Sequence, residues 1–335
     1  MSQNEEANSH LTWYIGKSVV CLILSLSFTI GIPGNIIVIW TVCKKMKQRS
    51  STVLLILNLA ISDLLVLATL PIWIYSFADS WVFGVPICKM LVYMVYSSMY
   101  ASVFVITALS LERFIAVFYP FSVQRWKNKA LIFKVVFLIW ILSFGFGASI
   151  IPFQDIQEIN GGLQCLGRSY SSNQQKVLNL LLETFVGFVI PFAIICTCYM
   201  CVGRKLRQMS YQSKQRTERL IVNVVVAFAV CWFPHHLFNI IDIVSMQIED
   251  SNQKIFSALN QITDIGVYIS GALVFISSCT NPVLYAFAAW SFQSHLGFTK
   301  ISRLFEEMTQ NVIQEVKKDN SLETVQDILI GTGTV

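Results

Sequence analysis

The chain has 335 residues, of which 55% are hydrophobic and only 13% are charged. Soluble globular domains carry about 25% charged residues, so this composition excludes an ordinary soluble protein and predicts a membrane protein. The net charge of +5 at pH 7 does not indicate nucleic-acid binding, because the basic residues lie in short loops between apolar stretches.

Seven apolar stretches follow a polar, acidic tail at residues 1–13, and each is long enough to span a bilayer. Backbone groups in lipid must find their hydrogen bonds within the protein, so helices are expected. The sequence therefore predicts an all-α membrane protein, with a seven-transmembrane-helix bundle at residues 14–289. The expected spans are 14–42, 52–77, 87–118, 130–153, 177–203, 219–246 and 257–289.

The distribution of Lys and Arg predicts the orientation of these helices. The loops after the first, third and fifth stretches hold most of the bases, whereas the other loops hold only Arg168, Lys176 and Lys254. Because cytoplasmic loops are enriched in bases, the N-terminus is expected outside the cell and the C-terminus inside.

The third stretch has a cysteine at one end and an acid–arginine pair at the other. Cys88 and Arg113 are 25 residues apart, which in a helix is about 38 Å and exceeds the hydrocarbon core of about 30 Å. Cys88 is therefore expected outside, and Glu112 and Arg113 inside. Cys88 and Cys165 are the only cysteines in or beside outer loops, so an oxidising exterior predicts a disulfide between them.

Several polar side chains lie at mid-membrane depth, where such residues are costly and indicate function. Asp63 lies halfway through the second stretch, and Ser102 shares the helix face of Arg113, about 16 Å deeper. Together with polar residues of the first and seventh stretches, they are predicted to hold a hydrated cation; the alternative is a purely structural hydrogen-bond network. The other members of this set are Asn35, Ser277, Ser278 and Asn281.

Glu183 lies about two turns below the outer surface in the fifth stretch, and His235 and His236 lie at similar depth in the sixth. A carboxylate at this depth needs a partner or a proton. The sequence predicts a ligand contact for Glu183 and leaves open an internal Glu–His bond. Because adjacent helical residues are about 100° apart, only one histidine can face the interior.

Three prolines interrupt neighbouring spans: Pro191 in the fifth, Pro234 in the sixth and Pro282 in the seventh. Proline removes a backbone hydrogen bond and kinks a helix. Kinks beside interior polar groups predict helices that move between two arrangements.

After the seventh span, residues 290–308 are predicted to form a short amphipathic eighth helix along the inner leaflet, with Phe292, Leu296 and Phe298 on one side. Residues 309–335 are polar and are expected to form a disordered cytoplasmic tail. An enzyme is not expected, because no second catalytic group matches Asp63 within the membrane.

With these features in order, the chain resembles the rhodopsin-like (class A) G-protein-coupled receptors over nearly its whole length. The matching residues are Gly34-Asn35, NLAISD ending at Asp63, Cys88 with Cys165, Glu112-Arg113-Phe114, Trp140, Pro191, Tyr199, CWFP at Cys231–Pro234 and NPVLY at Asn281–Tyr285. A retinal photoreceptor is excluded, because residues 257–289 contain no lysine.

The resemblance implies a receptor that binds its ligand from outside and activates a heterotrimeric G protein inside. It implies that Glu112 holds Arg113 at rest, that Trp232 forms the base of the ligand pocket, and that Tyr199 and Tyr285 repack toward Arg113 on activation. It also implies that Asp63, Ser102 and Asn281 form an allosteric sodium pocket, to which the predicted polar set adds Ser277 and Ser278 at comparable depth. No other cofactor is expected.

The finer resemblance is to the leukotriene B4 receptors of the chemoattractant branch, through MYASVFVITALSLER, LETFVGFVIPF, FPHHLFN and FISSCTNPVLYAF. It implies leukotriene B4 or a related hydroxy fatty acid as agonist, a G protein of the inhibitory class, and arrestin binding to a phosphorylated tail. The ligand contacts that it implies, taken with the interior residues above, are Tyr100, Glu183, Trp232, His236 and Asn239.

This chain departs from that pattern where a base is expected to receive the agonist carboxylate. Gln154 and Val267 occupy the expected basic positions, and Val92 stands where the family has histidine. Lys17, Lys89 and Arg168 are the candidate replacements. A class A receptor for a peptide chemoattractant or for another oxidised lipid is the alternative.

Overall fold

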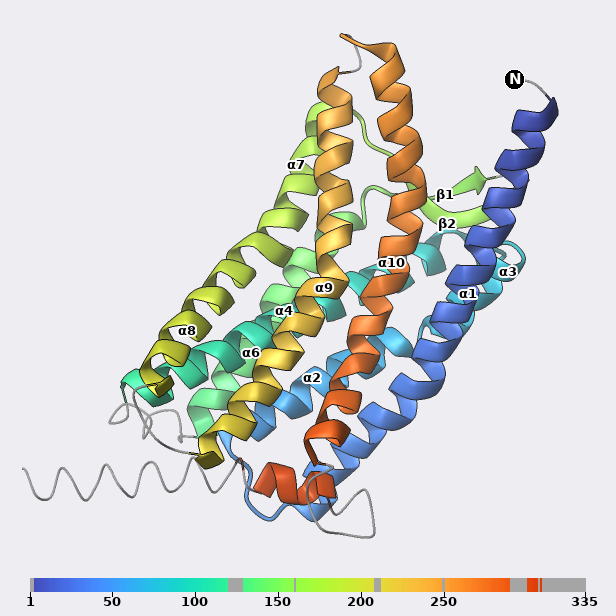
Figure 1. The fold of residues 1–335 in the computed structure, drawn as a ribbon. Helices are drawn as coiled ribbons and strands as arrows, with labels where there is room; N and C mark the ends of the chain where they lie inside the picture. Colours follow the sequence, from blue (N-terminus) through green and yellow to red (C-terminus); the bar gives the residue numbers. More distant parts are fainter. Residues whose placement is uncertain are drawn as a thin grey trace, which may run out of the picture.

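The computed structural model describes the backbone of residues 3–119, 129–159, 161–207, 212–248, 251–289, 300–306 and 308. Within this part of the chain, seven helical segments are long and apolar enough to cross a membrane. The predicted seven-helix bundle is therefore confirmed (Figure 1). The spans are Ile15–Lys45, Ser51–Ala78, Gly84–Phe118, Ala130–Ile150, Asn173–Lys205, Val222–Ile248 and Ile269–Phe287.

Some spans consist of more than one element, so the helix labels outnumber the spans. The elements are α1 (Gln3–Trp40), the π-helical turn Thr41–Lys45, α2 (Ser51–Leu67), α3 (Leu70–Ala78), α4 (Gly84–Phe118), α6 (Lys129–Gly147), the 3-10 turn Ala148–Ile150, β1 (Gln154–Ile159), β2 (Gly162–Arg168), α7 (Asn173–Thr184), the π-helical turn Phe185–Val189, α8 (Ile190–Arg207), α9 (Gln212–Ile248) and α10 (Gln253–Ala289).

Helix α4 is central to the bundle, since it packs against α2, α6, α8, α9 and the first strand (Figure 1). Its residues from Ser97 to Ser110 are almost all buried, and many of them join one large apolar core. Residues such as Phe133 and Phe137 on α6 are exposed instead, as expected for side chains that face lipid.

The outer loop between α6 and α7 forms a hairpin that the sequence analysis missed. Strand β1 pairs antiparallel with β2, with Gln154 opposite Arg168 and Asp155 opposite Gly167. The predicted disulfide between Cys88 and Cys165 is present, with a Cα–Cα distance of 5.6 Å, and it attaches β2 to the outer end of α4. The hairpin is thereby held over the outer end of the bundle.

The predicted kinks take different forms in the three spans. Pro234 and Pro282 lie inside the continuous helices α9 and α10. In the fifth span, the irregularity is a π-helical turn, Phe185–Val189, that ends two residues before Pro191. The second span also breaks between α2 and α3, at residues 68–69, and this break ends two residues before Pro71, which was not among the predicted kinks.

Helices α1 and α10 approach closely where the GN motif meets the NPVLY motif. A Cβ atom placed on Gly34 would lie 2.8 Å from both Cβ and Cγ of Pro282, whose ring cannot rotate away. We therefore expect Gly34→Ala to lower the free energy of unfolding by about 1–3 kcal/mol, the usual cost of overpacking. Thermal unfolding of the purified receptor measures this.

The matched control is Gly145→Ala on α6, where a Cβ would meet nothing within 4 Å. That variant should unfold at the wild-type temperature or slightly above it, because alanine favours helix more than glycine does. Equal stability of the two variants would contradict the close packing of α1 on α10.

Beyond the seventh span, residues 300–306 are helical. Ile301, Leu304 and Phe305 are buried, and the Phe305 ring meets the edge of Tyr285 at a centroid distance of 5.8 Å. This segment thus packs on the C-terminal end of α10. Phe292, Leu296, Phe298 and the tail 309–335 lie outside the described residues.

Candidate functional site

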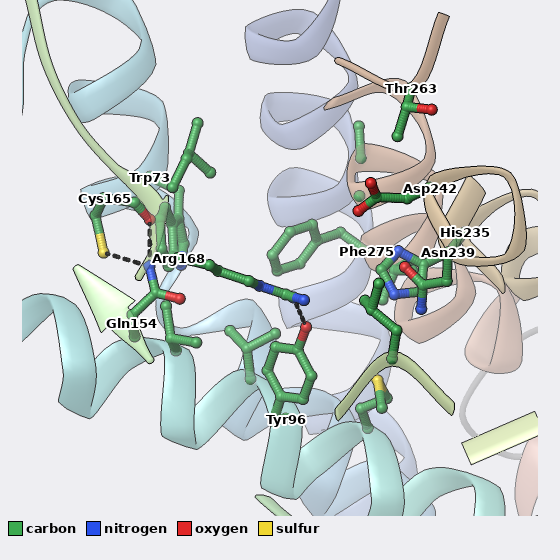
Figure 2. Close-up of a pocket in the computed structure, with 18 of the residues that line it drawn as sticks. Trp73, Tyr96, Gln154, Cys165, Arg168, His235, Asn239, Asp242, Thr263 and Phe275 are labelled. Carbon is green, nitrogen blue, oxygen red and sulfur yellow. Dashed lines mark hydrogen bonds between the residues drawn. The ribbon is translucent and has the colours of Figure 1, made fainter. Parts of the chain in front are cut away.

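A cavity of about 500 Å³ lies beneath the hairpin, among the outer ends of the helices (Figure 2). Much of its wall is apolar, with side chains from α1, α3, α4, α7 and α10 such as Leu24, Trp73, Met99, Leu180 and Phe275. The rest of the wall is polar, with side chains from the hairpin, α4, α7, α9 and α10 such as Gln154, Tyr96, Lys176, Asn239 and Asn260. A pocket of this volume with an apolar majority and polar groups that can orient a ligand is typical of a small-molecule site.

Arg168, at the end of β2, places its guanidinium inside this cavity. Figure 2 shows the side chain extending from the hairpin toward the hydroxyl of Tyr96, to which Nη2 donates a hydrogen bond. Its Nη1 lies 3.6 Å from Oε2 of Glu183, and 26% of the side-chain surface is exposed. Burial alone would lower the pKa of Arg168, but Tyr96 and Glu183 outweigh it and raise that pKa above its usual value.

Glu183 is the carboxylate at which four elements meet. Its side chain is only 4% exposed. From α4, the Tyr96 hydroxyl donates to it at 3.3 Å; from α9, His235 Nε2 lies 2.5 Å and Asn239 Nδ2 lies 3.3 Å from Oε1. With Arg168 as the fourth partner, Glu183 joins the hairpin, α4, α7 and α9.

This arrangement favours the internal Glu–His bond over a direct ligand contact. Asn239 and Trp232 line the cavity, whereas Tyr100, Glu183 and His236 lie behind its wall. Tyr100 is fully buried, with its ring 5.6 Å from that of Phe146. Tyr100, Glu183 and His236 therefore do not line the cavity in this structure, and their predicted contacts with a ligand stay predictions.

The two histidines have separate environments. His235 lines the cavity and bonds to Glu183. His236 is 2% exposed and stacks between rings, with centroids 4.9 Å from Phe188 and 6.1 Å from Trp232. His235 is thus the histidine at the cavity, whereas His236 is buried in the protein between Phe188 and Trp232.

A second ion pair joins α7 to α9 at the same cavity. Lys176 Nζ lies 2.8 Å from Oδ1 of Asp242, and both residues line the cavity. Sequence reasoning did not single out this pair, although a lysine and an aspartate at the outer ends of adjacent spans were a usable signal.

Two of the three positions where a base was expected to receive the agonist carboxylate lie at the same wall. Gln154 and Val92 both line the cavity, and the Gln154 amide donates to the carbonyl of Cys165 at 3.1 Å (Figure 2). The side chain of Val267 lies outside the described part of the chain. Among the three candidate bases, Arg168 lines the cavity and Lys17 and Lys89 do not.

Deeper in the bundle, the structure brings Asp63, Ser102 and Asn281 together. Asn281 Nδ2 donates to Asp63 Oδ2 at 2.8 Å, and the Ser102 hydroxyl lies 3.4 Å from Oδ1. Asn35 donates instead to the backbone carbonyl of Ser278, at 3.0 Å. Asp63 is 1% exposed, and its carboxylate beside hydroxyl oxygens is a donor set that suits a hard cation such as sodium.

At the inner end of α4, Thr52 on α2 connects the acid and the arginine. Its hydroxyl donates to Glu112 Oε2 at 2.9 Å and accepts from Arg113 Nη2 at 2.7 Å. Ser51 also donates to Glu112. The sequence predicted direct restraint of Arg113 by Glu112; the structure adds this hydroxyl, which was not considered.

Comparison with known proteins agrees with this architecture. Residues 34–285 match the model of the 7 transmembrane receptor (rhodopsin family). Leukotriene B4 receptor 1 of Homo sapiens is 32% identical over 286 residues, 85% of this chain and 81% of the human protein. The Rattus norvegicus receptor of that name is 37% identical over 287 residues, 85% of this chain and 80% of the rat protein.

A relative with a different name matches to a similar extent. Chemerin-like receptor 2 of Mus musculus is 32% identical over 302 residues, which cover 87% of this chain and 82% of the mouse protein. Both kinds of relative are chemoattractant-branch receptors. The family match covers well over half of the chain, so the chain belongs to the rhodopsin family of G-protein-coupled receptors, which are multi-pass plasma-membrane receptors and not enzymes.

Proposed function

We propose that this receptor binds a lipid mediator, leukotriene B4 or a related hydroxy fatty acid, and activates a heterotrimeric G protein of the inhibitory class in leukocyte chemotaxis and inflammatory signalling. The observation that carries this proposal is the mostly apolar cavity with Arg168 inside it. An apolar wall accommodates an acyl chain, and a guanidinium suits its carboxylate. The two relatives named leukotriene B4 receptor 1 support the same ligand class.

The remaining parts of the proposal follow from orientation. With the N-terminus outside, the cavity faces the exterior and Arg113 faces the cytoplasm, where the G protein binds. Phosphorylated residues of the tail would then be accessible to arrestin.

The direct test is the calcium and cAMP response of receptor-expressing cells to leukotriene B4 and related hydroxy fatty acids. We expect a response in the nanomolar range that pertussis toxin blocks, because the toxin inactivates inhibitory G proteins. Silence toward all these lipids would refute the ligand class while leaving the family unchanged.

A peptide chemoattractant is the second candidate ligand. Asp242 lines the cavity and could pair with a basic side chain of a peptide. The match to chemerin-like receptor 2 does not distinguish a peptide ligand from a lipid ligand. A response to peptides without any response to hydroxy fatty acids would select this alternative.

We also propose that Asp63, with Ser102, Ser277, Ser278 and Asn281, holds an allosteric sodium ion. Replacing sodium in the buffer by N-methylglucamine should then raise agonist affinity several-fold, because couplings between sites are typically 5- to 150-fold. Asp63→Asn should lose this dependence, since the amide cannot neutralise the ion. Agonist binding at the two buffer compositions measures it; a sodium effect that persists in Asp63→Asn would place the ion elsewhere.

A further inference from the structure

Two bases line the cavity, and each is paired with an acid: Asp242 also lines the cavity, whereas Glu183 lies behind its wall. The two ion pairs are not equivalent. Lys176 and Asp242 are 2.8 Å apart, whereas Arg168 and Glu183 are 3.6 Å apart. Glu183 also has Tyr96, His235 and Asn239 as partners. Glu183 can therefore lose Arg168 and remain hydrogen-bonded, because three donors stay in place.

Arg168 is likewise suited to exchange one carboxylate for another. A guanidinium has five N–H donors in a planar fork that matches a carboxylate. In the described structure, Nη2 bonds to Tyr96, the guanidinium also hydrogen-bonds the Tyr170 side chain, and its contact with the Glu183 carboxylate is the longer one, 3.6 Å from Nη1. The guanidinium thus already lies near one carboxylate, but the distance of 3.6 Å is longer than a hydrogen bond to a bound anion would be.

On this basis we infer that Arg168 binds the carboxylate of the agonist, and that Glu183 is the internal carboxylate that occupies its place in the agonist-free receptor. This inference rests on the proposed lipid function and names the group that replaces the bases missing at Gln154, Val92 and Val267. It makes Glu183 a positioning residue and Arg168 the ligand contact.

The exchange also affects the helices. Arg168 belongs to a hairpin that the disulfide attaches to α4, whereas Glu183 bonds to His235, which directly follows Pro234 in α9. The Arg168–Glu183 contact therefore joins an anchored loop to a kinked helix. An agonist that takes over Arg168 releases α9 from this restraint.

The test compares leukotriene B4 with its methyl ester, using nucleotide exchange on an added inhibitory G protein in receptor-containing membranes. Arg168→Gln should weaken the acid about 10- to 100-fold, the fold-change for a lost charged hydrogen bond, and leave the ester almost unchanged. Glu183→Gln should increase the potency of leukotriene B4 and leave that of its methyl ester unchanged, because the carboxylate that competes for Arg168 is gone. The double variant should behave like Arg168→Gln alone.

Asp242→Asn is the matched control, since it neutralises the carboxylate of the second ion pair, Lys176–Asp242, at the same cavity. If Glu183 and Asp242 acted only through their negative charge near the cavity, Glu183→Gln and Asp242→Asn would increase the potency of leukotriene B4 equally. That result would overturn the inference. Arg168→Lys, which keeps the charge, should recover part of the affinity and so separates a specific contact from misfolding. If Arg168→Gln left the ratio of the potencies of leukotriene B4 and its methyl ester unchanged, the inference would also be overturned, whereas the proposed lipid function would stand.

If the wild-type receptor responds to neither leukotriene B4 nor its methyl ester, the proposed function is refuted instead.

Nucleotide exchange measured without agonist tests the role of Glu183 separately. The restraint requires Arg168→Gln, Glu183→Gln and the double variant to raise agonist-free exchange by the same factor; unchanged exchange in all three would overturn it. Lys254→Gln, an exposed outer base away from the cavity, is the control for loss of charge.

Discussion

Arg113→Ala is expected to abolish agonist-driven G-protein activation while the receptor still reaches the plasma membrane in normal amounts. Arg113 lies at the inner end of α4, on the face proposed for the G protein, and only 6% of its surface is exposed. Its bond to Thr52 holds it beside α2 in the described structure. Removing the guanidinium leaves the cavity intact, so agonist binding should persist.

The measurement is G-protein activation normalised to surface receptor, with agonist binding on the same membranes. Arg113→Lys is the matched control: it keeps the charge without the planar fork, so it should retain a small part of the response. Full signalling by Arg113→Ala would remove the proposed coupling role.

Glu183→Ala is expected to lower the free energy of unfolding by about 3 kcal/mol or more, at the lower end of the range for breaking a buried ion pair. The change removes the shared acceptor of Tyr96, His235 and Asn239 and leaves Arg168 without its carboxylate. Buried donors that lose their acceptor account for most of this loss.

Thermal unfolding of the purified, agonist-free receptor measures the effect, and Glu183→Gln is the control. Glutamine keeps the size and one acceptor oxygen, so its unfolding temperature should lie much closer to that of the wild type. If alanine and glutamine were equally stable, Glu183 would not be the point at which these elements are joined.

Hydropathy and charge were sufficient to predict the seven spans, because a bilayer imposes length and apolarity on each helix separately. The disulfide was also predictable, since the topology left only Cys88 and Cys165 outside. The hairpin was missed although its signal is local: Asn160-Gly161, a dipeptide typical of two-residue hairpin turns, separates the paired residues Ile159 and Gly162. The position of the hairpin over the helices was not predictable in the same way, because it depends on packing around the attachment of β2 to α4.

Which side chains meet at the cavity could be predicted only in part. Periodicity indicated that one of His235 and His236 faces inward, but it could not select between them, because the rotation of α9 is determined by packing against neighbouring helices. Glu183 was correctly singled out as an unusual buried charge. That its partners are Tyr96, Arg168, His235 and Asn239 required the arrangement of four elements in space.

The π-helical turn Phe185–Val189 has a consequence for engineering this receptor. A π turn contains an additional residue compared with the α-helix, and Glu183 lies two residues before its first residue, Phe185. Deleting one residue from this turn to restore regular helix would rotate Glu183 by about 100° relative to the inner half of the span. A chimaera that takes the outer half of the fifth span from one receptor and the inner half from another must therefore join both parents on the same side of residues 185–189. Otherwise the Glu183 carboxylate will face away from Arg168.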